Sequence, residues 1–194
     1  TLEKNIPVTS GIGGGSADAA ATVRLFSKFY NKPELPIEKL ISLGSDVPVC
    51  MQKGIVRMMG AGEEIINLSP APKVGILLVN PRKALSTAEV FSAVKEKNNP
   101  GLNLQGSGEK SLNSWFDWIN SMRNDLTASA IDLIPDIRFI LDKLITCDGA
   151  RVVRMSGSGA TCFALFEDFD LLQNAKLKFR KECPSFWCEA GELI

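Results

Sequence analysis

The chain has 194 residues, 45% of them hydrophobic, which is enough to bury a sizeable core in one large domain or two small ones. Its 22 basic and 22 acidic residues balance, so the charge gives no support for nucleic acid or a membrane as a partner. Histidine is absent, which excludes serine–histidine and cysteine–histidine catalysis and disfavours a zinc site. The five cysteines form no Cys-x-x-Cys pair and no apolar run could span a bilayer, which favours reduced thiols in a cytoplasmic protein.

The first third of the chain predicts two strands and two helices. Leu2–Val8 is expected to be a short strand that leads into a glycine-rich stretch. Ala17–Tyr30 predicts a helix whose apolar side is formed by Ala20, Val23, Leu25, Phe26 and Phe29. Pro36–Leu43 predicts a second helix closed by Gly44, and Gly54–Met59 predicts a strand.

The rest of the chain mixes strands and helices without strict alternation, which indicates an α+β fold. Expected strands are Val74–Val79, two strands around a Gly/Ser turn between 150 and 166, and Phe186–Ala190. Expected helices are Ser86–Val94, Trp115–Met122, Pro135–Thr146 and Leu171–Glu182. The proline-rich linker Ser69–Pro72 predicts a division into residues 1–70 and 71–194.

The most informative stretch is Gly11-Ile12-Gly13-Gly14-Gly15-Ser16, directly in front of the first predicted helix. A glycine-rich turn can point backbone N–H groups inward, and the N-terminus of a helix adds free N–H groups and the positive end of its dipole. Ser16 is expected to be the N-cap or a first-turn residue of this helix, and Asp18 is expected near its start. The stretch therefore predicts an anion cradle for a nucleotide phosphate. It matches neither the Walker A nor the dinucleotide-binding pattern. The alternative is a glycine-rich connection that packs a helix tightly against a sheet.

Two further turns carry candidate residues. Gly44-Ser45-Asp46-Val47-Pro48 predicts a rigid turn that could direct the Asp46 carboxylate at a hydroxyl. The carboxylate could then accept the proton of that hydroxyl. The alternative is that Asp46 only bonds local backbone N–H groups. The second turn is Ser156-Gly157-Ser158-Gly159-Ala160-Thr161, between two predicted strands.

In this order, the glycine-rich stretch and these two turns resemble the motifs of the GHMP small-molecule kinases. Within that superfamily, the triple glycine followed by Ser16-Ala17-Asp18-Ala19-Ala20 is similar to the branch that phosphorylates 4-diphosphocytidyl-2-C-methyl-D-erythritol. The Asn124-Asp125-Leu126 and Ser86–Phe91 segments are also similar to that branch. The resemblance implies the last part of a ribosomal-protein-S5-like domain followed by a ferredoxin-like α/β subdomain. It also implies ATP-dependent phosphorylation of the substrate's 2-hydroxyl, in the non-mevalonate route to isoprenoids.

The resemblance assigns roles residue by residue. Asp46 is the implied catalytic residue, and Phe91 and Thr87 are implied contacts of the substrate. ATP is the implied cofactor together with Mg²⁺, for which Ser16 or Asp18 could supply a contact; Asp18 could equally be only a first-turn charge. The implied ATP phosphate loop is Gly11, Gly13, Gly14, Gly15, Ser16 and Ala17. The implied third motif, which supports the loop, is Gly157, Ser158 and Gly159.

The family's pattern begins upstream of the glycine-rich stretch, with a segment that carries a catalytic lysine. We therefore expect the chain to lack that segment, to take it as a partner beside the small-molecule substrate, and to have negligible kinase activity alone. Exposed apolar surface is expected near residues 2–30.

Two other functions stay open on the sequence. One is a GHMP kinase for a mevalonate derivative, homoserine or a sugar, against which the Gly-Gly-Gly-Ser form of the loop argues. The other is a non-catalytic nucleotide-binding or interaction module.

Overall fold

A computed structural model describes residues 3–8, 10–60, 62–102, 104 and 111–193. The chain divides into two compact units. We call Gly13–Ala71 the helical unit, and Thr1–Ile12 together with Pro72–Ile194 the sheet unit. The division into residues 1–70 and 71–194 stays a prediction about the family's domains.

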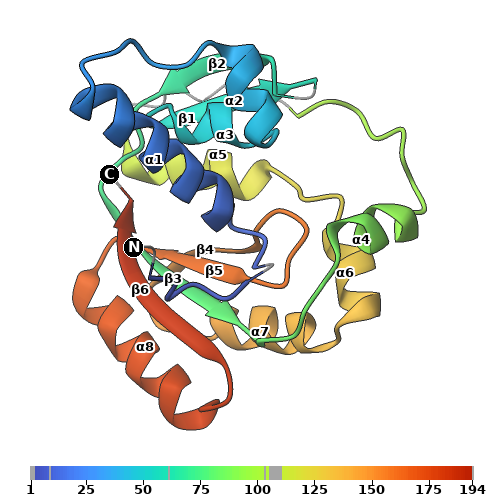
Figure 1. The fold of residues 1–194 in the computed structure, drawn as a ribbon. Coiled ribbons are helices and arrows are strands. Elements are labelled where there is room, and N and C mark those ends of the chain that lie inside the picture. Colours follow the sequence, from blue (N-terminus) through green and yellow to red (C-terminus); the bar gives the residue numbers. More distant parts are fainter. Residues whose placement is uncertain (1–2, 9, 61, 103, 105–110, 194) are drawn as a thin grey trace. The chain divides into compact units, whose positions relative to one another are not determined.

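The helical unit contains a small core and a hairpin. Its elements are α1 (Gly14–Phe29), α2 (Ile37–Leu43), α3 (Val47–Cys50), β1 (Ile55–Met59) and β2 (Glu64–Ser69). Figure 1 labels these elements in blue to blue-green. The antiparallel hairpin pairs Met59 with Glu64 next to its turn. Helix α2 ends at Gly44, as predicted, whereas β2 was not predicted from the sequence.

Helix α1 has two apolar faces with different surroundings. Ala20 and Val23 are buried against Leu40 of α2 and Val47 of α3. The other predicted apolar residues lie on the surface, where Leu25 is 64%, Phe26 54% and Phe29 76% exposed. The exposed apolar surface expected near residues 2–30 is therefore present.

The sheet unit is built on an antiparallel four-stranded sheet of order β4-β5-β3-β6 among the described residues. Its strands are β3 (Val74–Asn80), β4 (Ala150–Met155), β5 (Cys162–Phe166) and β6 (Trp187–Leu193). Its helices are α4 (Thr87–Ala93), α5 (Leu112–Ser121), α6 (Thr127–Leu133), α7 (Asp136–Ile145) and α8 (Phe169–Glu182). With α7 and α8 as its connecting helices, the β3-α7-β4-β5-α8-β6 order is the ferredoxin-like arrangement, which confirms the α+β prediction.

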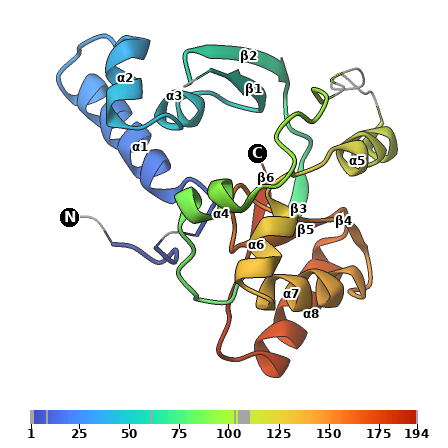
Figure 2. The same ribbon diagram turned by 90° about the vertical axis from the view of Figure 1, so that its right-hand side faces the viewer.

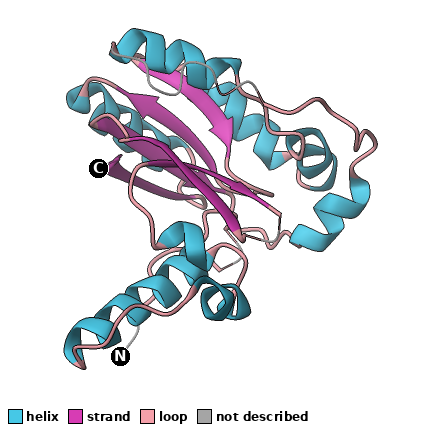
Figure 3. Cartoon of the chain, turned by 90° about the horizontal axis from the view of Figure 1, so that it is seen from above, coloured by secondary structure: helices cyan, strands magenta, loops and turns pink. Residues whose placement is uncertain are grey.

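The main core lies between this sheet and the helices α7 and α8 (Figures 1 and 3). Leu77 and Val79 point from β3 into it because residues two apart share a face of a strand. Ile137, Ile140 and Leu144 form the buried stripe of α7, which lies within the predicted helix Pro135–Thr146. On the other elements, α5 contacts β4, and α4 lies beside α6 (Figure 2).

One predicted strand is wrong. The described residues 3–8 form neither helix nor strand, because the segment finds no strand partner in the described sheet. Pro7 also lacks the N–H that a ladder would need. The segment is instead held by a bond from Trp187 Nε1 to the Asn5 carbonyl oxygen at 3.1 Å.

Candidate functional site

The turn between β4 and β5 is folded tightly onto itself in the sheet unit. Ser156 N donates to the Thr161 carbonyl oxygen at 2.9 Å, and Gly159 N donates to the Ser156 carbonyl oxygen at 2.9 Å. Gly157 and Gly159 have φ angles of 50° and 90°, a region that glycine adopts without strain. The turn therefore requires glycine where the third motif was predicted.

Asn124 holds this turn from outside. Its Nδ2 donates to the carbonyl oxygens of Met155 at 3.1 Å and Gly157 at 2.8 Å, and its Oδ1 accepts from Leu126 N at 3.0 Å. The Asn-Asp-Leu segment thus acts through a side chain that joins two backbone carbonyls. The segment was identified by resemblance alone, and nothing in its pattern indicated this contact.

Gly11 lies directly against the same turn. Its φ is 72°, and a Cβ at this position would lie 2.1 Å from the Gly159 carbonyl oxygen. A Cβ at Gly157 would lie 2.8 Å from the Gly11 carbonyl oxygen, which also accepts a bond from Ser156 Oγ at 2.9 Å. Only glycine permits this backbone approach, so the first glycine of the loop and the third motif are joined within one unit.

Thr87 is brought to the same turn. It is the first residue of α4, and its Oγ1 lies 2.9 Å from Ser158 Oγ in a hydrogen bond. The structure therefore connects two residues that the sequence placed in different roles. A substrate contact of Thr87 stays a prediction.

The rest of the glycine loop begins the helical unit. Gly13, with φ 67°, is the N-cap of α1, so the helix starts at Gly14, before the predicted Ala17. Ser16 lies in the first turn, which is one of the two positions predicted for it. Asp18 lies in the second turn, because the helix starts earlier than predicted. No side chain caps this N-terminus, and a Cβ added at Gly13 or Gly15 would meet no heavy atom within 4 Å. The described structure thus leaves a helix N-terminus open on its glycine side.

The turn that contains Asp46 lies beside this N-terminus within the helical unit. The Cβ position of Gly44 is 3.9 Å from Ser16 Oγ, which places the Gly44–Pro48 turn next to the first turn of α1. Asp46 is the N-cap residue of α3, but its side chain makes no capping bond and is exposed. The alternative role of bonding local N–H groups is therefore not the one that its side chain takes.

Two backbone contacts fix the position of this turn. A Cβ on Gly62 would lie 2.3 Å from the Ser45 carbonyl oxygen, so the hairpin turn approaches the residue before Asp46 as only glycine allows. At the other end of α3, Arg24 donates to the Cys50 carbonyl oxygen at 2.8 Å. Gly62 was not singled out from the sequence, although its Gly-Ala-Gly turn was the available signal.

Cys50 reports the charge of Asp46. Burial raises the pKa of the Cys50 thiol, the Asp46 carboxylate raises this pKa further, and Arg24 lowers it. A negative charge disfavours the thiolate because like charges repel.

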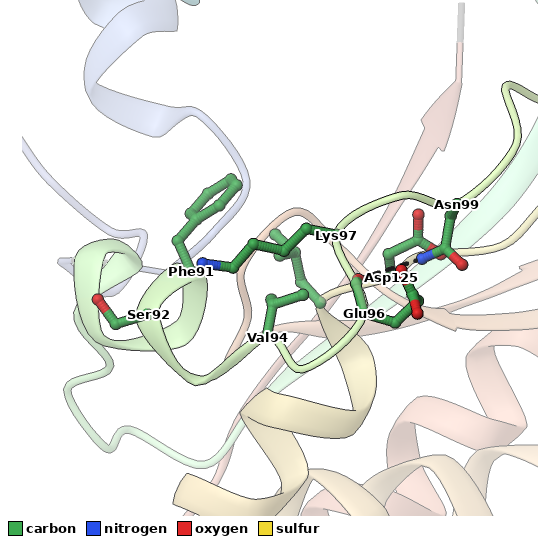
Figure 4. Close-up of a pocket in the computed structure, with 8 residues that line it drawn as sticks. Phe91, Ser92, Val94, Glu96, Lys97, Asn99 and Asp125 are labelled. Atoms are coloured by element: carbon green, nitrogen blue, oxygen red, sulfur yellow. Dashed lines mark hydrogen bonds between the residues drawn. The ribbon is translucent and has the colours of Figure 1, made fainter.

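Phe91 lies on the rim of a cavity of about 560 Å³ in the sheet unit. The cavity is lined by Phe91, Ser92, Val94, Glu96, Lys97, Asn99, Asp125 and Leu126. In Figure 4 the Lys97 side chain extends toward Phe91, whose ring is left free, and Asn99 Nδ2 donates to the Glu96 carbonyl oxygen at 3.4 Å. Phe91 is 56% exposed. An exposed ring next to a cation suits a ligand that combines an aromatic base with negative charge.

Neither a protein-made metal cluster nor a membrane span is found among the residues that the structure describes. No three or more histidine, cysteine or acidic side chains gather there as metal ligands. No described helix is at once long enough and apolar enough to cross a bilayer.

Comparison with known families finds two matches along the chain. The sequence model described as GHMP kinases N terminal domain matches residues 1–57. The model described as GHMP kinases C terminal matches residues 103–185.

Individual relatives match over the whole chain. The 4-diphosphocytidyl-2-C-methyl-D-erythritol kinases of Agrobacterium fabrum and Rhizobium etli are 43% and 42% identical, and the chain spans 65% of the length of each. The enzyme of the same name from Paracoccus denitrificans is 42% identical, and the chain covers 68% of it.

Solved structures agree in fold. A crystal structure of 4-(cytidine 5'-diphospho)-2C-methyl-D-erythritol kinase matches with a TM-score of 0.77 at 28% identity, covering 98% of this chain and 69% of that one. Homoserine kinase from Cytophaga hutchinsonii matches with a TM-score of 0.70 at 16% identity, covering 98% of this chain and 68% of that one, which shows a shared fold alone. With relatives of this identity and coverage, the chain belongs to the GHMP kinases, in the family of the 4-diphosphocytidyl-2-C-methyl-D-erythritol kinases.

Proposed function

We propose that the whole protein transfers a phosphoryl group from ATP to the 2-hydroxyl of 4-diphosphocytidyl-2-C-methyl-D-erythritol, a step toward isoprenoid precursors. The observation that carries the proposal is the helical unit's uncapped α1 N-terminus beside the turn that bears the exposed side chain of Asp46. Relatives of 42–43% identity that carry the name of this kinase support the choice of substrate.

The N-terminus of α1 fits the phosphates of ATP. The first-turn N–H groups of a helix have no partner inside the helix, and the dipole favours negative charge there. The open space at Gly13 and Gly15 lets an anion approach the backbone, which a Cβ would hinder. Bound ATP supplies the phosphoryl group, and Mg²⁺ would neutralise the charge of the ATP phosphates. The Ser16 hydroxyl, a side-chain oxygen in the first turn of α1, would be the contact of Mg²⁺ on the protein.

Asp46 fits the role of proton acceptor. Its carboxylate is exposed and makes no capping bond, so it is available to a substrate hydroxyl. Phosphoryl transfer depends mainly on positioning and charge stabilisation, and a base that accepts the hydroxyl proton adds to both. The contacts at Ser45 and Cys50 hold the backbone on either side of Asp46.

Phe91 fits a pyrimidine base. Stacking of a base on an aromatic ring contributes about 1–3 kcal/mol, equivalent to about 5- to 150-fold in binding. The neighbouring Lys97 supplies positive charge at the same cavity. Both features suit a cytidine diphosphate group.

The test is a substrate panel with the whole protein. We expect ADP formation with ATP and 4-diphosphocytidyl-2-C-methyl-D-erythritol, and none above background with homoserine, mevalonate or a hexose. Phe91→Ala should raise KM for the cytidine substrate about 5- to 150-fold with little change in KM for ATP. Phe169→Ala is the matched control, since Phe169 is also a partly exposed phenylalanine on a helix, 38% exposed, and does not line the cavity. Turnover of homoserine or mevalonate in place of the cytidine substrate would overturn the proposal.

A further inference from the structure

A buried asparagine connects the end of β3 to the turn before β5. Asn80 is the last residue of β3 and only 2% exposed. Its Nδ2 donates to Thr161 Oγ1 at 2.9 Å, and its Oδ1 accepts from Arg82 N at 2.7 Å. Both ends of the amide are thus in use, so neither an aspartate nor an apolar side chain could replace all of its bonds.

Thr161 carries the connection to the glycine loop. It is fully buried, and its backbone N donates to the Ser10 carbonyl oxygen at 3.2 Å. One residue further along the loop, the Gly11 carbonyl oxygen accepts from Ser156 Oγ. Two consecutive carbonyls of the chain entering the loop are therefore fixed against the sheet unit.

Fixing these carbonyls also orients the N–H groups beside them. In a planar trans peptide the N–H points opposite to the carbonyl of the preceding residue. When the carbonyls of Ser10 and Gly11 point toward Thr161 and Ser156, the N–H groups of Gly11 and Ile12 point the other way, away from the turn. Gly11 is the first residue of the predicted phosphate loop, and Ile12 lies between it and Gly13.

We propose that Asn80 and Thr161 are positioning residues for nucleotide binding. Asn80 holds the Thr161 side chain, Thr161 holds the Ser10 carbonyl, and the loop is thereby kept in one conformation before a ligand arrives. A loop that is ordered in advance binds with a smaller loss of conformational entropy. The inference rests on the proposed function, because it takes the glycine loop to be the nucleotide phosphate loop.

The test compares three variants of the whole protein. Thr161→Val keeps the shape but removes the hydroxyl and leaves Asn80 Nδ2 without its buried acceptor, whereas Thr161→Ser keeps the hydroxyl. Val74→Ala is the matched control, since Val74 is fully buried at the opposite end of the same strand and touches none of these bonds. For each variant we would measure Kd for ATP, KM and kcat, thermal stability, and hydrogen exchange of the peptide that includes Ser10–Ser16.

We expect Thr161→Val to raise both Kd and KM for ATP roughly tenfold, to change kcat little and to speed exchange in the loop peptide. Thr161→Ser should restore values within about twofold of wild type. Val74→Ala should lower the melting temperature without changing Kd or loop exchange. If wild type binds ATP and Thr161→Val binds it equally well, or if Val74→Ala weakens binding as much, the inference is overturned. If wild type binds no nucleotide, the proposed function itself fails.

Discussion

Replacing Gly15 by alanine should make the protein more stable and a worse binder of ATP. Gly15 is the second residue of α1, its φ is in the ordinary range, and a Cβ there meets nothing within 4 Å. The substitution therefore introduces no clash and no backbone strain in the free protein. Any loss of binding must come from the space that the new methyl group takes from a ligand.

The two effects can be estimated separately. Alanine in place of glycine at a compatible position stabilises by about 0.4–1 kcal/mol because it restricts the unfolded chain. For a chain of this size that raises the melting temperature by about 1–4 °C. If the methyl group displaces one phosphate oxygen from a backbone N–H, the lost charge-assisted bond costs about 1.5–3 kcal/mol, or about 12- to 150-fold in Kd.

Calorimetric titration with ATP and a thermal melt of the same sample measure both quantities. Gly101→Ala is the matched control, since Gly101 is an exposed loop glycine whose added Cβ also meets nothing within 4 Å. It should leave Kd for ATP unchanged. Equal ATP affinity in Gly15→Ala and wild type would refute the assignment of the α1 N-terminus to the phosphates.

Three further changes test the contacts around the site. Asn124→Ala removes three hydrogen bonds and should lower the free energy of unfolding, measured by urea denaturation, by about 2–3 kcal/mol. The control Asn120→Ala removes one exposed hydrogen bond and should lower it by less than about 1 kcal/mol. Equal losses in the two variants would contradict the role given to Asn124. Gly62→Ala should lower kcat by displacing the Asp46 turn, and unchanged kcat would show that the turn tolerates the displacement. Asp46→Asn should lower the pKa of the Cys50 thiol, which burial and the carboxylate raise, so alkylation at a fixed pH below that pKa should become faster; an unchanged pH profile of alkylation would contradict it.

Local patterns predicted most of the elements and the position of the glycine loop. The end of α2 at Gly44 and the buried stripe of α7 follow from residues that are neighbours in sequence. The start of α1 was placed late because Ser16 resembles a cap, whereas Gly13 takes that position by its left-handed backbone. A single-sequence pattern cannot distinguish the two when glycines precede a serine.

Contacts between distant residues could not be predicted in the same way. Asn80 and Thr161 are 81 residues apart, and nothing in the pattern around either indicates a shared bond. The strand expected at Leu2–Val8 failed for a related reason, since a strand forms only where another strand accepts its hydrogen bonds. Gly62 was predictable in part: the sequence indicated a turn at Gly60-Ala61-Gly62 but not the close approach of Gly62 to Ser45.

The most direct test of the account is the turnover of Asp46→Asn in the whole protein, with ATP and 4-diphosphocytidyl-2-C-methyl-D-erythritol. Asparagine keeps the shape of the side chain but cannot accept the hydroxyl proton as a carboxylate does. We expect kcat to fall about 10²- to 10⁴-fold while Kd for ATP stays within about twofold, and Glu38→Gln on the exposed face of α2 to change neither. A kcat within twofold of wild type would contradict the claim that this carboxylate accepts the proton in phosphoryl transfer.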